Sequence, residues 1–194
     1  LGSNSPSEPH YTPPTISEPL GILLKNRRPT GPFNEVWPGV YIGDAYSMTC
    51  RAAEPGCHTH IVSAAAGPAH IDTGPGFYTD TCIQYRGVEA PDSRDFDLSP
   101  YFYPTAEFIH NGLSQEGKNG SCVLLALYLL NTSLCSAGKV FVHCARGISR
   151  SAALVLAYLM IRERLPLAEA VVAVRKHRNI LPNAGFLANS VIWT

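Results

Sequence analysis

Residues 139–151 read KVFVHCARGISRS, and they are followed by the apolar run AALVLAYLMI at residues 152–161. Residues 139–142 have the apolar, β-branched character of a buried strand, and the run after Ser151 suits a buried helix. The sequence therefore predicts a strand, a tight loop and a helix. In such a unit the loop N–H groups and the helix dipole converge on one spot, which makes an anion-binding site.

Two side chains give this anion site its chemistry. Cys144 and Arg150 are separated by five residues, and the positive field of the loop should lower the pKa of the Cys144 thiol into the roughly 3.5–7.5 range of activated thiols. The planar guanidinium of Arg150 can grip two phosphoryl oxygens, and Gly147 lets the backbone turn closely around the anion. An inert buried cysteine beside a surface arginine is the alternative, but the joint pattern favours a reactive thiolate.

Residues 143–151, in the form His-Cys-x-x-Gly-x-Ser-Arg-Ser, resemble the signature of the cysteine-dependent protein tyrosine phosphatases. The narrower resemblance is to the atypical dual-specificity phosphatases, in particular the subgroup of muscle and testis. It covers most of residues 34–187 and includes residues 34–38 (NEVWP), 41–45 (YIGDA), 59–62 (THIV), 72–75 (DTGP), 96–99 (FDLS), 158–160 (YLM) and 182–187 (PNAGFL). The resemblance implies hydrolysis of phosphotyrosine and phosphoserine or phosphothreonine in proteins through a phosphocysteine, without a metal or other cofactor.

The fold expected from the sequence is α/β. Short strands at residues 40–42, 60–64, 83–88 and 140–143 alternate with helical stretches such as 99–113, a pattern that predicts a three-layer sandwich with a central, largely parallel sheet flanked by helices. Ligands of such sheets bind beyond the carboxyl ends of the strands, where Cys144 lies. Residues 1–32 are rich in Pro and Ser and are expected to form a disordered arm before the phosphatase domain, residues 33–194.

Hydrolysis also requires a proton donor for the leaving group. The acidic segment after the strand 83–88 offers several carboxyl groups, and the resemblance selects Asp92 as general acid. Asp95 and Asp97 are expected instead to serve the next helix, with Ser99 as its N-cap and Pro100 at its first position. By resemblance, Ser151 hydrogen-bonds the sulfur and assists breakdown of the phosphoenzyme.

The remaining predicted site residues surround the phosphate. Arg178 ends an amphipathic helix and is either a cation that stabilises the helix C-terminus or, by resemblance, a contact to a second phosphate or acidic residue of the substrate. Arg146 either adds charge at the pocket mouth or points into solvent. The expected phosphate-binding residues are His143, Ala145, Arg146, Gly147, Ile148, Ser149, Arg150 and Arg178.

Composition limits the partners and the compartment. The chain has 15 basic and 15 acidic residues, so it lacks the basic field that attracts nucleic acid. Six irregularly spaced cysteines indicate a reduced cytoplasmic protein, with the nucleus as a second location. Cys50, Cys57, His58 and His60 match no standard metal spacing, so no metal is expected. No run is long enough to span a membrane. The expected partners are phosphorylated proteins, with signalling kinases among the candidates.

Residues 118–138 depart from the family pattern, because an apolar stretch at 122–130 interrupts the usual short connection into the strand at 140. Such a segment packs on the domain, binds a partner or promotes aggregation, or it is sequence foreign to the natural protein, such as a retained intron. Ser63 stands where the family usually has asparagine. The chain begins at Leu1 and its last helix ends at Thr194, so both ends are expected to be incomplete.

Two classes of function stay open at this point. The first is an active phosphatase, and the second is a phosphate-binding or scaffolding protein with impaired catalysis. The presence of Cys144, Arg150, Asp92 and Ser151 favours catalysis. A low-molecular-weight phosphatase or arsenate reductase would place the loop near the N-terminus, and a phosphoinositide phosphatase commonly carries lysines in the loop, which this loop lacks.

Overall fold

The computed structural model describes residues 16–25, 30–47, 59–67, 74–79, 83–114 and 138–191. Its centre is one five-stranded sheet in the order β1-β2-β5-β3-β4. Only β1 runs antiparallel to its neighbour, and the other pairs are parallel. The strands are β1 (Phe33–Trp37), β2 (Val40–Asp44), β3 (His60–Ser63), β4 (Gln84–Gly87) and β5 (Val140–Cys144).

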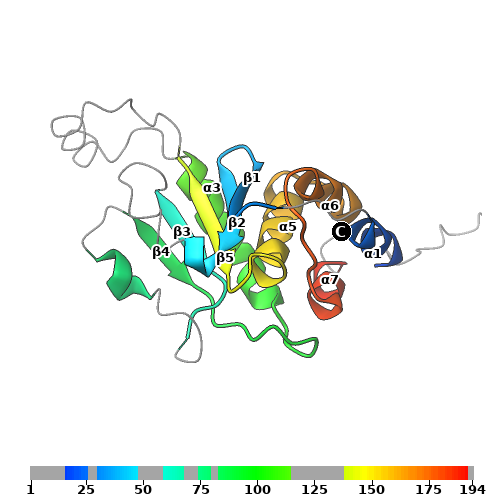
Figure 1. Cartoon of the computed structure of the whole chain (residues 1–194), viewed down its shortest axis with the longest axis horizontal. Helices are drawn as coiled ribbons and strands as arrows, with labels where there is room; N and C mark the ends of the chain where they lie inside the picture. Colours follow the sequence, from blue (N-terminus) through cyan, green and yellow to red (C-terminus); the bar gives the residue numbers. More distant parts are fainter. Residues whose placement is uncertain are drawn as a thin grey trace, which may run out of the picture.

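The helices pack around α5, whose residues from Arg150 to Met160 are all buried. Figure 1 shows α5, α6, α7 and α1 grouped on one side of the sheet. An apolar sequence on every face explains this position, since such a helix must be enclosed by other elements. The helices are α1 (Ser17–Leu24), α3 (Phe102–Ser114), α5 (Arg150–Arg162), α6 (Leu167–Arg175) and α7 (Ala184–Val191), with 3-10 turns η1 (Pro75–Tyr78) and η2 (Ser99–Tyr101).

Strand β5 separates the two faces of the sheet. Val140, Val142 and Cys144 belong to the main core with the helices, while Phe141 joins Ile61 and Tyr78 of η1 in a smaller cluster on the opposite face. Alternation of side chains along a strand produces this division. A β-branched, apolar strand buried on both faces is typical of the centre of a parallel sheet. The predicted α/β architecture, with a largely parallel sheet flanked by helices, is confirmed.

Three local features differ from the sequence predictions. Residues 17–24 form α1 within the arm that was expected to be disordered, because Leu23 is buried and Arg175 of α6 donates hydrogen bonds to the carbonyls of Leu23 and Lys25. Strand β1 was not expected from the pattern of residues 33–37. Finally, Ser99 is not an N-cap; it begins η2, and its N–H donates to Asp97 Oδ1 at 3.0 Å.

Residues 115–137 lie outside the described part of the chain, and with them nearly all of the segment 118–138 that departs from the family pattern. Within the described part, no helix combines the length and the apolar character that crossing a bilayer requires.

Helix α3 crosses the sheet at Gly112, where a Cβ would lie 2.8 Å from both His60 Cγ and Val140 Cγ2. Gly112→Ala should therefore destabilise the protein, because overpacking costs about 1–3 kcal/mol and outweighs the helix-propensity gain of about 1 kcal/mol. Thermal or urea unfolding measures the effect. The control is Asn111→Ala at the adjacent exposed position, which should change the free energy of unfolding by less than about 0.5 kcal/mol. A Gly112→Ala protein as stable as wild type would show that α3 is not held this closely.

Candidate active site

The loop of residues 145–149 connects the carboxyl end of β5 to the first residue of α5. Cys144 is the last residue of the strand and Arg150 the first of the helix, so a short loop brings both to one end of the sheet. Gly147 sits midway with φ +64°, and a Cβ there would lie 2.4 Å from the carbonyl oxygen of Gly43 in β2. Both the left-handed backbone and this close approach require glycine.

Every carbonyl of this loop is bonded away from the sulfur. The acceptors and donors are Ala145 O with Ala45 N–H (3.4 Å), Arg146 O with Arg178 Nη2 (3.5 Å), Gly147 O with Arg178 Nε (2.8 Å), Ile148 O with Leu181 N–H (2.9 Å) and Ser149 O with Ala153 N–H (2.9 Å). Since C=O and N–H of a trans peptide point in opposite directions, the loop N–H groups are turned inward. The loop is thus an anion-binding nest of backbone donors.

Cys144 Sγ lies inside this nest, with only 2% of the residue exposed. The Gly147 N–H donates to the sulfur at 3.3 Å, and the Ser151 hydroxyl donates at 3.4 Å. Burial by itself raises the pKa of the Cys144 thiol. Hydrogen bonds from the Ser151 hydroxyl and from the N–H groups of Ser151, Ile148 and Arg146 outweigh burial, so the pKa lies below its ordinary value. The site therefore favours a thiolate.

The guanidinium of Arg150 is buried and links the start of α5 to the segment after β4. Its Nη1 donates to the carbonyl of Ala90 at 2.9 Å, and its Nε lies 3.9 Å from Asp92 Oδ2. Among the described residues, Nε has no hydrogen-bond partner. A buried donor of this kind is available for a phosphoryl oxygen, which would satisfy it.

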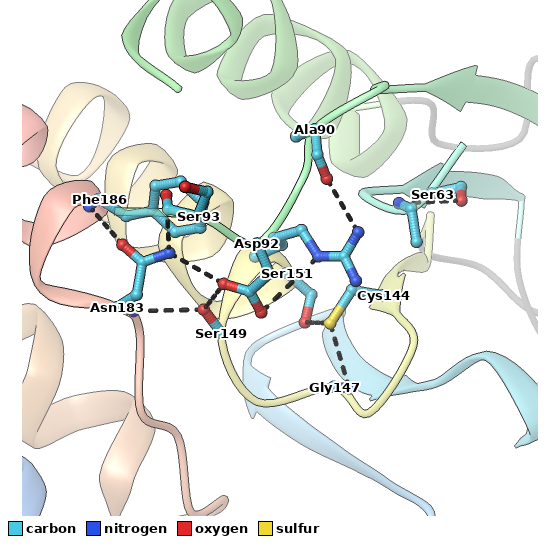
Figure 2. A network of polar contacts seen from close by, with 12 residues as sticks. Ser63, Ala90, Asp92, Ser93, Cys144, Gly147, Ser149, Ser151, Asn183 and Phe186 are labelled. Carbon is cyan, nitrogen blue, oxygen red and sulfur yellow. Dashed lines mark hydrogen bonds and ion pairs between the residues drawn. The ribbon is translucent and has the colours of Figure 1, made fainter. Parts of the chain in front are cut away.

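Asp92 belongs to a polar network that Figure 2 shows beside the sulfur. Its Oδ1 accepts hydrogen bonds from the Ser149 hydroxyl at 2.7 Å and from Asn183 Nδ2 at 2.9 Å. Asn183 also accepts the N–H of Phe186 at 3.0 Å and so caps α7, while its own N–H donates to Ser149 Oγ at 3.2 Å. The network leaves Oδ2 as the carboxylate oxygen nearer Arg150, in a side chain 37% exposed.

Two predicted phosphate-binding residues do not face the site. His143 is fully buried on the other side of β5, where its ring lies 6.0 Å from that of Phe141. Neighbouring residues of a strand point to opposite faces, so His143 cannot share the position of Cys144. Burial lowers the pKa of His143 to about 4, against smaller raising effects of the Cys144 backbone and of Asp44, and the imidazole is neutral at pH 7.

Arg178 is the second predicted phosphate-binding residue that does not face the site. Only 3% of it is exposed, and its guanidinium donates to the loop carbonyls and to two groups around β1: Gly31 O at 3.0 Å and Asn34 Oδ1 at 2.8 Å. A side chain buried in this way does not offer itself to a second phosphate of the substrate.

The other predicted positions divide as follows. Ala145 and Arg146 are exposed at the loop surface, and Ile148 is partly buried. Asp97 serves η2 as expected, and Asp95 is exposed, with its N–H donating to Ser93 Oγ at 3.3 Å. Cys50, Cys57 and His58 lie outside the described residues, among which no group of three or more His, Cys, Asp or Glu side chains could hold a metal ion.

Asn183 and the Ala90 carbonyl were not assigned a role from the sequence. An asparagine just before the helix at 184 is a recognisable N-cap signal. Its partnership with Asp92, however, joins residues far apart in the chain, and no local pattern carries that information.

Comparisons with known proteins agree with this geometry. Residues 124–192 match the family described as "Dual specificity phosphatase, catalytic domain". Human "Dual specificity protein phosphatase 13B" is 42% identical over 180 residues, covering 91% of this chain and 80% of that protein. The crystal structure of human DUSP28 has a TM-score of 0.62 at 24% identity and covers 85% of this chain and 94% of that one. The crystal structure of the human tyrosine phosphatase-like serine/threonine/tyrosine-interacting protein has a TM-score of 0.60 at 27% identity and covers 83% and 94%.

Ser151→Ala removes one hydrogen bond to the sulfur and should raise the pKa of the Cys144 thiol. A hydrogen bond to a charged group contributes about 1.5–3 kcal/mol, so the expected rise is about one unit or more. The pKa is read from the pH dependence of iodoacetamide alkylation, followed by mass spectrometry of the peptide that contains Cys144.

The control is Ser190→Ala, which removes another buried helical serine, one whose hydroxyl donates to Phe186 O. Its thiol pKa should equal that of wild type. Equal values for Ser151→Ala and wild type would mean that the hydroxyl contributes nothing to the thiolate.

Proposed function

The chain belongs to the dual specificity protein phosphatases, and we propose that it dephosphorylates proteins through a phosphocysteine at Cys144. The observation that carries this proposal is the inward-facing nest of loop N–H groups around a buried sulfur whose pKa is lowered. A thiolate at the floor of an anion site is the arrangement that covalent phosphoryl transfer requires.

In the first step the Cys144 thiolate attacks phosphorus and the ester oxygen departs. The loop N–H groups and the guanidinium of Arg150 bind the three remaining phosphoryl oxygens, where negative charge accumulates in the transition state. Arg150 Nε is positioned for this because it is buried and has no hydrogen-bond partner among the described residues. Its Nη1 is held by Ala90, which fixes the plane of the fork.

Asp92 protonates the leaving oxygen. Ser149 and Asn183 donate to Oδ1, so we assign the proton transfer to Oδ2, the oxygen 3.9 Å from Arg150 Nε. Once it has given up its proton, the same carboxylate can accept one from water in the second step.

In the second step water attacks the phosphocysteine and the thiolate leaves. Ser151 supports this departure, since its hydroxyl donates to the sulfur at 3.4 Å and stabilises the negative charge that returns there. The cycle then ends with inorganic phosphate in the loop and the original thiolate restored.

The substrates are phosphorylated proteins, and we propose signalling kinases among them. We also propose a cytoplasmic location, with the nucleus second, because a thiolate nucleophile needs a compartment that keeps cysteine reduced. We propose that nucleic acid is not a partner, because the basic and acidic residues of the chain balance.

The test varies the leaving group. Asp92→Asn should lower kcat by about 10²–10⁴ for phosphotyrosine or phosphothreonine peptides, because their leaving oxygens need a proton. It should affect an activated aryl phosphate much less, since a nitrophenolate leaves unprotonated. Steady-state kinetics in the presence of EDTA measure both, and Cys144→Ser supplies the zero-activity reference.

Asp95→Asn is the matched control, because Asp95 is an exposed carboxylate of the same loop outside the Asp92 network. It should retain wild-type kinetics with every substrate. If kcat falls in a leaving-group-dependent way in Asp95→Asn but not in Asp92→Asn, the general acid is Asp95 and not Asp92. Wild-type turnover by Cys144→Ser would rule out the phosphocysteine mechanism. A wild-type protein that binds phosphate but turns over no substrate would support the scaffolding alternative.

A further inference from the structure

Arg178 makes contacts that neither substrate binding nor a simple helix C-terminus explains. Its Nε donates to Gly147 O at 2.8 Å and its Nη2 to Arg146 O at 3.5 Å. Among the described residues that hold the carbonyls of residues 145–149, Arg178 is the one that does so with its side chain, since the others are backbone N–H groups of Ala45, Leu181 and Ala153. One buried guanidinium therefore sets the direction of two consecutive peptide groups.

These two peptides carry donors that face Cys144. The carbonyl of Arg146 belongs to the same peptide as the N–H of Gly147, which donates to Sγ at 3.3 Å. The carbonyl of Gly147 likewise shares its peptide with the N–H of Ile148, whose hydrogen bond helps to lower the pKa of the thiol. Because a peptide is planar and trans, holding the oxygen outward holds the N–H inward.

The loop needs such a restraint at this place. Gly147 has no Cβ and occupies φ +64°, and glycine passes between positive and negative φ at little cost. A peptide next to glycine can therefore rotate, and rotation of either one would turn a carbonyl oxygen toward the sulfur. An oxygen there would oppose both a thiolate and a phosphate.

Arg178 is itself held by elements outside the loop. Its Nη1 donates to Gly31 O, two residues before β1, and to Asn34 Oδ1 within β1. Burial lowers the pKa of the Arg178 guanidinium, and the negative charge of Asp44, at the end of β2, offsets part of that effect. The guanidinium thus connects the loop to β1 at one edge of the sheet. Asp92 follows β4, which forms the opposite edge.

We propose that Arg178 is a positioning residue that fixes the Arg146–Gly147 and Gly147–Ile148 peptides with their N–H groups toward Cys144 and the phosphate. It acts through the backbone and does not touch the substrate. This inference deepens the proposed function, since it concerns the same site, but it can be tested without turnover.

A direct effect of the positive charge must be separated from the effect on geometry. Arg178→Lys keeps the charge but offers an ammonium on a flexible stem, which cannot reproduce the fork that spans two carbonyls. Arg178→Met keeps the apolar stem and removes both the charge and the fork. The matched control is Arg175→Met, because Arg175 also donates to two backbone carbonyls, those of Leu23 and Lys25, away from the site.

The charged and titratable groups around the sulfur must stay unchanged in this comparison. His143 is neutral above pH 5 because burial lowers its pKa to about 4. The others are Asp44 at the paired position of β2, Asp92 and Arg150 across the site, and Arg146 at the loop surface. All of them are present in every variant.

Two measurements are made on purified full-length protein. The first is the pKa of the Cys144 thiol from the pH dependence of its alkylation, read on the Cys144 peptide. The second is the dissociation constant of inorganic phosphate, from the protection that it gives against alkylation. Both Arg178 variants should show a thiol pKa raised by about one unit or more and phosphate binding weakened about tenfold or more. Arg175→Met should match wild type in both.

Two results would overturn the proposal. If Arg178→Lys matches wild type, charge alone suffices and the geometry of the fork is irrelevant. If folded Arg178→Met matches Arg175→Met, Arg178 has no influence on the loop. Should Arg178→Met fail to fold, Arg178→Lys decides by itself, since a raised pKa supports the positioning role and an unchanged pKa rejects it. Failure of the phosphatase reaction itself would leave both readouts measurable.

Discussion

The structure depends on one constraint, that all carbonyls of residues 145–149 point away from Cys144. Each oxygen is held by a donor from another element, and the N–H groups are consequently turned toward the sulfur. Backbone dipoles fixed in this way need no reorganisation when charge develops, which is the main source of electrostatic catalysis. The buried helix α5 and the buried strand β5 provide the rigid ends between which so short a loop can keep this conformation.

Asp92 lies in the loop after β4 and Cys144 ends β5, and the position of Asp92 is fixed by contacts with the residues at the start of α5 and α7. Arg150 holds Ala90, while Ser149 and Asn183 hold Asp92. Asn183 combines this with the N-cap of α7. A change in the packing of α7 would therefore be transmitted to the carboxylate, although that helix contains no reacting group.

Much of this arrangement could be predicted from the sequence because it is local. The strand, loop and helix of residues 140–162 and the pairing of Cys144 with Arg150 follow from spacing and hydrophobic pattern. The approach of Ser151 to the sulfur was expected from the family resemblance. What failed depended on distant partners. Arg178 looks like an ordinary cation at a helix end, and only the folded chain brings it to the carbonyls of Arg146 and Gly147.

Two further misses have other causes, of which the first is local and the second depends on tertiary packing. His143 adjoins the nucleophile in sequence, but strand alternation places its ring against Phe141 on the other face. Helix α1 is short and has a weak pattern of its own, so its formation depends on packing against α6 and on the guanidinium of Arg175, which short-range reasoning does not reveal. The role of Asp92 as general acid remains a prediction, whereas its contacts with Ser149 and Asn183 are features of the structure.

The central claim is that the nest around Cys144 serves covalent phosphoryl transfer. The most direct measurement is a single-turnover reaction with a phosphotyrosine peptide, quenched in acid at short times and followed by mass spectrometry of the peptide that contains Cys144. We expect a phosphoryl group on Cys144 that forms before inorganic phosphate is released and decays at the rate of turnover. Release of phosphate with Cys144 unmodified at all times, or a phosphoryl group on another residue, would contradict the account.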